Sequence, residues 1–391
     1  MEYEKVLTIF EQVPRPFAAL YLPALQKNIV DIAKRAQNTP IRIATKSVRC
    51  RWVMHYTLQQ NALYQGLMTY HPAETSWLAQ NGLDNLLIGY PYTSENELIT
   101  VAKLIKEGKN ITFMADLPEH LELLNKIGQS LNVKIPICLD VDMSTDLGWV
   151  WFGVKRSSIR TISDLQVRLK LIRKLSYVDL VGMMGYEAQI AGLGEKQKDF
   201  LKRLIIPILK KISLKKLADR RKKMYETIVQ EGFQLKIVNG GGTGSIEKTI
   251  QEKYINEVTV GSGLYSSGLF DMYNDFRHQP SLFFGIEITR NPEPNIYTCA
   301  GGGYIASGAV GLEKQPKIFL PKGLQFLKEE GFGEVQTPFY SPQKLKLGDF
   351  VLLRHAKAGE LCERFQSIYI FDNEQIVEEV PTYRGEGKCF V

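Results

Sequence analysis

A lysine follows directly after one of the short apolar runs of the chain. The run Ile41-Arg42-Ile43-Ala44-Thr45 has the β-branching of a strand, and Lys46 is the next residue. If this run is a barrel strand, its carboxyl end opens into the mouth of the barrel and carries the lysine amine there. Desolvation in such a mouth lowers the pKa of a lysine and makes its amine a nucleophile. From position alone, an exposed lysine in an ordinary loop is the plainer alternative.

Two glycine-rich loops are candidates for binding a phosphate group. They are Asn239-Gly240-Gly241-Gly242-Thr243-Gly244-Ser245 and Gly261-Ser262-Gly263-Leu264-Tyr265. Glycines let backbone amides approach an anion, and barrels commonly bind phosphate with the loops after strands seven and eight. Tight turns without a ligand are the alternative. Because both loops follow the expected strands seven and eight, we expect the two loops together to bind a phosphate group.

A lysine nucleophile together with a phosphate site suggests pyridoxal phosphate. This cofactor is held by a lysine as a Schiff base, and it also carries a phosphate group. A sugar-phosphate lyase is the alternative for the same residues. Asp140 and Asp142 alternate on the expected fifth strand and so point the same way, which suits polar support of a cofactor pocket.

Two further polar residues have a functional and a structural interpretation. His71 follows the expected second strand, where it would assist proton transfer or cap the next helix. Arg42 lies on the expected first strand, where it would contact the cofactor or form a salt bridge at the bottom of the barrel.

The elements that must position these residues repeat as strand and helix. Eight strands are expected, at residues 41–45, 66–70, 85–90, 111–115, 134–141, 180–185, 235–239 and 257–261, with helical segments between them. Eight is the number that closes a (β/α)8 TIM-type barrel. After residue 275 the strands continue without helices. The sequence therefore predicts an α/β barrel over residues 1–276 and an all-β C-terminal domain over residues 277–391. A lead-in strand, residues 17–22, would pair with the β-domain or close the barrel floor.

Composition and charge indicate a globular chain without an extended nucleic-acid-binding tract. The 391 residues are 44% hydrophobic and 23% charged, with a net charge of +7. Much of the positive excess lies between Lys196 and Lys223, in a pattern typical of a solvated helix face. The five cysteines form no CxxC pair, and the acidic start is unlike a signal peptide. We expect a cytoplasmic protein with reduced thiols that binds neither nucleic acid nor a membrane.

The order of these motifs resembles the fold-type III pyridoxal-phosphate enzymes, the group of alanine racemase, and within it the D-threonine aldolase and D-serine dehydratase branch. The resemblance extends from Phe17 to about Phe276. It rests on residues 19–22, 25–29, 41–46, 82–91, 139–142 and 185–187 and on the two glycine loops. It implies that Lys46 is the Schiff-base lysine, that Tyr186 lies beside the pyridine ring, and that Tyr265 belongs to the cofactor site. It also implies that the phosphate is held by Gly241, Gly242, Thr243, Gly261 and Ser262.

The same resemblance implies an activity. The expected enzyme is a lyase that acts at Cα and Cβ of a D-amino acid, by aldol cleavage or deamination of a β-hydroxy amino acid. An amino acid racemase is the alternative, although the late tyrosine region of alanine racemase is not recognisable. A non-catalytic pyridoxal-phosphate-binding protein and a metal-dependent sugar lyase are further alternatives; the β-domain argues against the former. The resemblance also implies a homodimer.

The family's metal site is altered in this sequence. The aldolase branch binds a divalent metal through a His-x-Cys or His-x-Asp pair near its end, whereas this chain has His355-Ala356-Lys357. Cys362 would replace the second ligand if residues 356–361 form a loop with Gly359 as its turn. That arrangement would give a zinc or manganese site at His355 and Cys362. With or without the metal, the match implies that His355 is a catalytic residue near the substrate.

Overall fold

Eight parallel strands close into a barrel. The computed structural model describes residues 1–148, 151–196, 199–302, 304–307, 311–357 and 359–391. The barrel strands are β2 (Ile41–Ala44), β3 (Tyr64–Thr69), β4 (Leu86–Ile88), β5 (Ile111–Ala115), β6 (Ile135–Asp140), β9 (Val178–Gly185), β10 (Ile237–Gly240) and β11 (Glu257–Val260). The barrel closes because β11 pairs with β2 as well as with β10. The expected barrel and its eight strands are confirmed.

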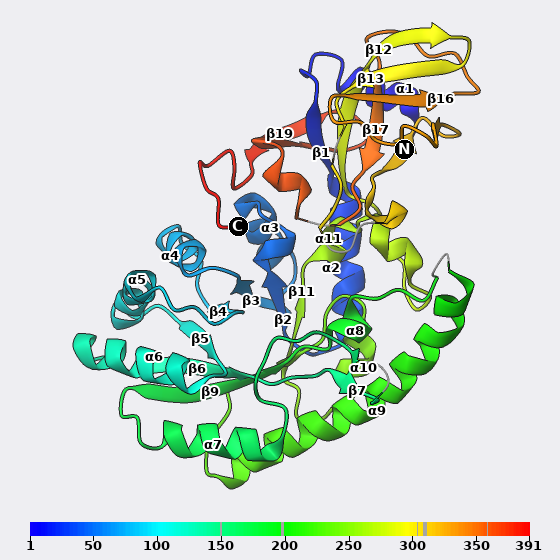
Figure 1. The fold of residues 1–391 in the computed structure, drawn as a ribbon. Coiled ribbons are helices and arrows are strands. Elements are labelled where there is room, and N and C mark those ends of the chain that lie inside the picture. The colour runs from blue at the N-terminus through cyan, green and yellow to red at the C-terminus, as the bar shows by residue number, and fades with distance from the viewer. Residues whose placement is uncertain (149–150, 197–198, 303, 308–310, 358) are drawn as a thin grey trace.

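Helices cover the outside of the barrel (Figure 1). They are α2 (Leu22–Ala36), α3 (Arg51–Gln60), α4 (Pro72–Gln80), α5 (Glu95–Lys106), α6 (Pro118–Leu131), α7 (Ile162–Ile172) and α9 (Phe200–Gln230), with short helices α8 (Ala188–Ala191), α10 (Ile246–Thr249) and α11 (Ser262–Tyr265). Their apolar faces pack on the strands in one continuous core that extends into the C-terminal region. No helix in the described part of the chain has the length and hydropathy needed to span a bilayer.

The C-terminal region is a β-sheet, as expected. Its strands are β12 (Leu282–Glu293), β13 (Ile296–Ala300), β14 (Lys317–Leu320), β15 (Gln325–Phe326), β16 (Gln336–Tyr340), β17 (Phe350–Arg354), β18 (Ser367–Phe371) and β19 (Ile376–Pro381). The sequence pattern does not predict β15, which has only two residues, or β16, which follows a glycine-rich turn. A two-stranded ribbon, β7 (Thr145–Asp146) with β8 (Trp151–Phe152), lies outside both sheets.

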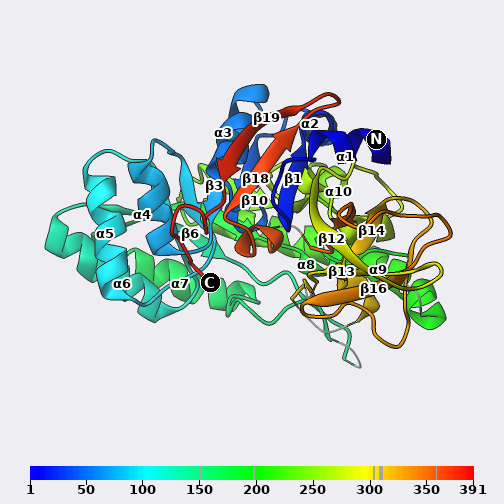
Figure 2. The ribbon, with the colours of Figure 1, turned by 90° about the horizontal axis from the view of Figure 1, so that it is seen from above.

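The first strand of the chain belongs to this C-terminal sheet. Strand β1 (Phe17–Tyr21) pairs antiparallel with β12 and parallel with β18, so it lies between the two, as Figure 2 shows. Helix α1 (Tyr3–Ile9) packs beside it through Val6, in a cluster with Phe10 and Phe283. Of the two interpretations of the lead-in strand, the structure therefore shows pairing with the β-region.

The basic run between Lys196 and Lys223 is only partly a solvated face. It lies largely on α9, the long helix along the outer edge of the barrel (Figure 1). Lys210 is buried and forms an ion pair with Glu195, and Arg221 is buried between Glu187 and Glu252. The expectation is wrong for these two cations, which pair with carboxylates instead of facing water.

Candidate active site

A cavity of about 650 Å³ opens at the carboxyl ends of the barrel strands. This size is ordinary for a site that takes a cofactor and a small substrate. Seven of the residues expected at the cofactor site line it: Lys46, Tyr186, Gly241, Gly242, Thr243, Gly261 and Ser262. The barrel thus brings together four separate regions of the sequence: the lysine, a tyrosine and the two glycine loops.

Lys46 lies in the short turn Thr45–Ser47, directly after β2. Its amine donates a hydrogen bond of 2.5 Å to the hydroxyl of Tyr90, which follows β4 and also lines the cavity. Tyr90 is not among the site residues expected from the sequence. The sequence does hold a signal for it, because Tyr90 lies at the carboxyl end of an expected barrel strand, where side chains reach the mouth of the barrel.

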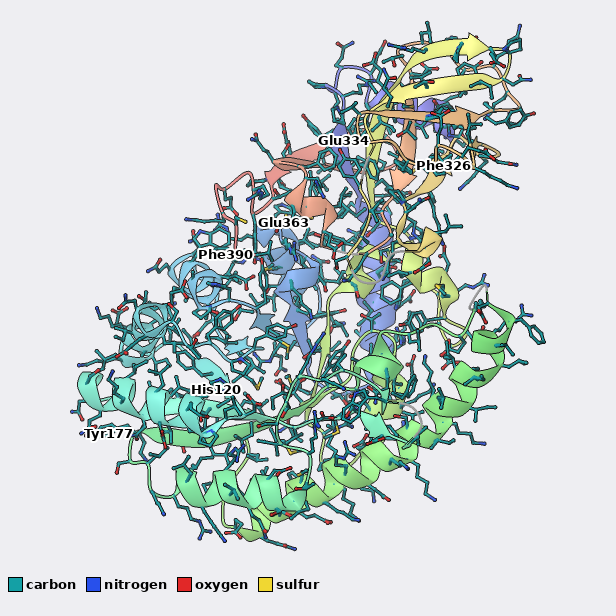
Figure 3. All side chains as sticks on the ribbon, viewed as in Figure 1. His120, Tyr177, Phe326, Glu334, Glu363 and Phe390 are labelled. Atoms are coloured by element: carbon teal, nitrogen blue, oxygen red, sulfur yellow. The ribbon has the colours of Figure 1, made fainter. Side chains whose placement is uncertain are left out.

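A loop of the β-region lies against the backbone of the lysine turn. Gly359 has a φ of +80°, and a Cβ at this position would collide with the carbonyl oxygen of Lys46. Glu363, labelled in Figure 3, forms an ion pair of 2.9 Å with Arg49, whose Nε donates to the same Lys46 carbonyl oxygen. Lys357 on this loop lines the cavity. The β-region therefore fixes the turn that carries the lysine, within one chain.

The first glycine loop is held by the buried carboxylate of Glu187. Glu187 accepts hydrogen bonds from the amide of Gly241 (3.1 Å) and the hydroxyl of Ser245 (3.0 Å), and it pairs with Arg221 at 2.7 Å. The amide of Gly242 donates to the Ser245 hydroxyl at 3.1 Å. The amides of Gly241 and Gly242 are thus already used inside the protein, so these two glycines shape the loop instead of donating to a ligand.

The two glycine loops contact each other and the lysine turn. The hydroxyl of Thr243 accepts a hydrogen bond of 3.3 Å from the amide of Gly263, where a Cβ would collide with the threonine side chain. A Cβ on Gly261 would lie 2.8 Å from the carbonyl oxygen of Ala44 and from the Cβ of Ser47. Glycine is needed at both positions because the backbones approach so closely.

Where the two glycine loops meet, some hydrogen-bond donors have no acceptor among the described residues. The amides of Thr243 and Ser262, and the hydroxyl of Ser262, have no acceptor among the described residues, and both residues line the cavity. Converging backbone amides and a hydroxyl form the kind of site that binds a phosphate group. With Lys46 in the same cavity, the residues present fit pyridoxal phosphate.

Two tyrosines expected at the cofactor site have different positions. Tyr186 lines the cavity beside Gly242, and burial, with help from Glu187 and Tyr90, raises the pKa of its hydroxyl to about 12. Tyr265 is fully buried and donates to the carbonyl oxygen of Val48 at 2.9 Å; it does not line the cavity. Tyr265 therefore supports the lysine segment from behind and is not placed to contact a cofactor.

The structure does not support the expected metal site. Gly359 does turn the loop as expected, but His355 and Cys362 are both buried and neither lines the cavity. His355 contacts the carbonyl oxygen of Leu282 through Nδ1, and burial lowers the pKa of its imidazole to about 3. Burial also raises the pKa of the Cys362 thiol. No third carboxylate, histidine or cysteine completes a metal site among the described residues.

The other candidates have mixed outcomes. Asp140 and Asp142 both line the cavity. His71 caps α4, accepting from the amide of Ala73 at 3.1 Å, which is the structural interpretation. Arg42 pairs with Glu257 at 2.9 Å below the cavity, which is the expected salt bridge at the bottom of the barrel.

Comparisons with known proteins agree with this architecture. Residues 20–267 match the family model "Alanine racemase, N-terminal domain". A D-threonine aldolase from Filomicrobium marinum superposes with a TM-score of 0.80 at 15% identity, covering 95% of this chain and 96% of that one. A D-threo-3-hydroxyaspartate dehydratase from Delftia sp. HT23 gives a TM-score of 0.76 at 12% identity, covering 95% and 98%.

An alanine racemase from Clostridium difficile 630, in complex with cycloserine, gives a TM-score of 0.67 at 18% identity, covering 94% of this chain and 99% of that one. No curated protein matches the chain by sequence. The family model spans more than half of the chain and contains the lysine turn and both glycine loops. The chain therefore belongs to the alanine racemase N-terminal domain family, whose barrel is that of the fold-type III pyridoxal-phosphate enzymes.

Proposed function

We propose that this chain is a pyridoxal-phosphate-dependent lyase that binds the cofactor through Lys46 and acts at Cα and Cβ of a D-amino acid with a β-hydroxyl group. One observation carries the proposal. The amine of Lys46 and the unpaired donors of Thr243 and Ser262 open into the same cavity. A covalent anchor and an anion site within one cavity are what this cofactor requires.

Each cavity residue has a role in this proposal. Thr243 and Ser262 bind the phosphate, and Tyr186 packs beside the ring. Tyr90 positions the Lys46 amine, which binds the cofactor at rest and accepts the Cα proton during turnover. Pyridoxal phosphate, when bound, supplies a sink for the electrons of a bond broken at Cα.

The substrate class follows from the structural neighbours. Two of them are named as a D-threonine aldolase and a D-threo-3-hydroxyaspartate dehydratase, and both names describe β-hydroxy D-amino acids. Both neighbours cover this chain through the β-region as well as the barrel. This shared architecture supports the same substrate class here.

The cofactor assignment is tested by reduction with borohydride. Purified protein loaded with pyridoxal phosphate should absorb visible light, and reduction should fix the pyridoxyl group on Lys46, as found by peptide mapping. Lys46→Ala should abolish the label. Lys357→Ala is the matched control, because Lys357 is a second lysine of the same cavity and should not affect the label. A label on Lys357, or saturated protein without visible absorption, contradicts the proposal.

The reaction is tested with D- and L-threonine, D- and L-serine and alanine as substrates. Glycine and acetaldehyde from D-threonine indicate aldol cleavage, whereas a 2-oxo acid with ammonia indicates deamination. Interconversion of alanine enantiomers without either product would make the enzyme a racemase. Cofactor bound at Lys46 without turnover of any of these substrates would favour a binding protein.

A further inference from the structure

Three carboxyl groups line the cavity, and one of them has no partner. Asp116 accepts from the amide of Ser158 at 2.9 Å, and Asp142 accepts from the amide of Ser144 at 2.6 Å. Asp116 also contacts His120, and Asp142 also pairs with Arg160. The carboxyl group of Asp140 forms no hydrogen bond or ion pair with any residue that the structure describes. Its oxygens are therefore free for a ligand in the cavity.

Asp140 lies across the barrel from Lys46. The closed strand order is β10-β11-β2-β3-β4-β5-β6-β9, so β6, which ends at Asp140, is four strands away from β2 in either direction. Cys138, two residues earlier, packs inside the barrel against Met114 and Met184. Because side chains alternate along a strand, Asp140 also points inward, one step nearer the mouth. The lysine and the carboxyl group thus lie on opposite sides of the barrel mouth, above the side chains of Met114, Cys138 and Met184.

The surroundings of Asp140 favour its neutral form. Burial, followed by repulsion from Asp116 and Asp142, raises the pKa of its carboxyl group to about 8, against the opposing effect of Arg156 on the cavity rim. Cys138 shares its strand and is itself uncharged, since burial raises the pKa of its thiol. At neutral pH the carboxyl group accordingly has a proton to give.

We propose that Asp140 is the acid that protonates the departing β-hydroxyl group of the substrate, on the side of the cavity opposite Lys46. This inference rests on the proposed function and selects dehydration among its outcomes. The Lys46 amine takes the Cα proton, and the electron pair of the Cα–H bond becomes a Cα–Cβ double bond. The Cβ–O bond breaks with its electron pair on oxygen, and the proton of Asp140 completes a water molecule. Aldol cleavage needs a base at this oxygen instead, for which a neutral carboxyl group is unsuited.

The test compares two leaving groups in the holoenzyme. D-Serine must lose hydroxide, which needs a proton, whereas β-chloro-D-alanine loses chloride, which does not. Asp140→Asn should lower pyruvate release from D-serine by 100-fold or more, the usual contribution of a general acid. Release from β-chloro-D-alanine should stay within about three-fold of the wild type, because Lys46 still removes the Cα proton. The wild-type rate with D-serine should fall as the pH rises through about 8.

Two measurements separate failure of this inference from failure of the proposed function. Cofactor titration and borohydride labelling of Lys46 in Asp140→Asn report on the cofactor site independently of turnover, and both should match the wild type. Asp179→Asn, an exposed carboxylate at the start of β9, is the control for a change of charge and should leave both rates unchanged.

Three outcomes would overturn the role of Asp140. They are an equal loss with both substrates, an unchanged rate with D-serine, and a wild-type enzyme that binds the cofactor at Lys46 but eliminates from neither substrate. Absence of the cofactor from Lys46 would instead overturn the proposed function.

Discussion

The hydroxyl of Tyr383 donates a hydrogen bond of 2.7 Å to the buried carboxyl group of Glu74, which ties the segment after β19 to helix α4 of the barrel. The second oxygen of Glu74 accepts from the amide of Tyr70, also at 2.7 Å. Burial raises the pKa of Glu74 to about 7, because these hydrogen bonds only partly replace the lost hydration.

This pair predicts how stability depends on pH. Since the pKa of Glu74 is raised from 4.5 to about 7 on folding, the folded chain keeps a proton that the unfolded chain releases between these values. The contribution of Glu74 to the free energy of unfolding is therefore fully present below about pH 4.5 and is lost as the pH rises through about 7. Glu74→Gln, neutral at every pH, should be roughly 1–3 kcal/mol more stable than the wild type at pH 8 and similar to it at pH 4.5. Urea unfolding of the apoprotein measures both.

The exposed Glu122 on α6 supplies the control for this effect. Glu122→Gln should follow the wild-type pH dependence. A Glu74→Gln variant that loses stability equally at both pH values would show that the charge of Glu74 is not what titrates.

Glu187→Gln should damage both stability and cofactor binding. The substitution removes one carboxylate partner of the buried Arg221 and weakens the anchor of the first glycine loop. Breaking a buried ion pair costs roughly 3 kcal/mol, and Arg221 retains Glu252. The urea midpoint and a pyridoxal phosphate titration report the two losses. Glu226→Gln, which breaks an exposed pair with Lys222, should change the free energy of unfolding by less than about 0.5 kcal/mol.

Gly359→Ala should weaken cofactor binding more than the same substitution at another glycine with a positive φ. Gly359 and Gly348 both have a positive φ, of +80° and +90°. A Cβ added at Gly359 would collide with the Lys46 turn, whereas a Cβ added at Gly348 would have no described atom within 4 Å. Gly348→Ala should therefore cost about 1 kcal/mol of unfolding free energy without changing cofactor affinity. Equal cofactor affinities in the two variants would mean that the β-region does not position Lys46.

Tyr90→Phe should lower the apparent affinity for pyridoxal phosphate about five-fold, because one hydrogen bond to the Lys46 amine contributes about 1 kcal/mol. Tyr92→Phe is the matched control for this variant. It removes a hydroxyl that donates a hydrogen bond of 2.6 Å to the carbonyl oxygen of Tyr70, and Tyr92 does not line the cavity. It should change stability but not cofactor affinity. Absorbance titration distinguishes the two variants, and a Tyr90→Phe affinity equal to the wild type would remove this role.

The barrel could be predicted from the sequence because each strand and helix is a local pattern, and Lys46 could be placed because it directly follows a strand. The position of His355 could not be predicted in this way. It depends on the path of the loop at Gly359, which is fixed by contacts with Lys46 and by the Arg49–Glu363 pair, both distant in sequence. Likewise, no local sequence pattern shows that Glu187 accepts a hydrogen bond from the amide of Gly241, while the amide of Thr243 has no acceptor among the described residues.

The position of β1 in the C-terminal sheet has a consequence for folding during synthesis of the chain. Strand β1 leaves the ribosome well before its partner β12, which begins at Leu282, about 260 residues after Tyr21. At 5–20 residues per second, translation exposes β1 for roughly 13–50 s before a partner exists. During this interval Phe17 and its apolar neighbours lack their native cover, so nascent chains stalled before residue 282 are expected to recruit chaperones through this strand.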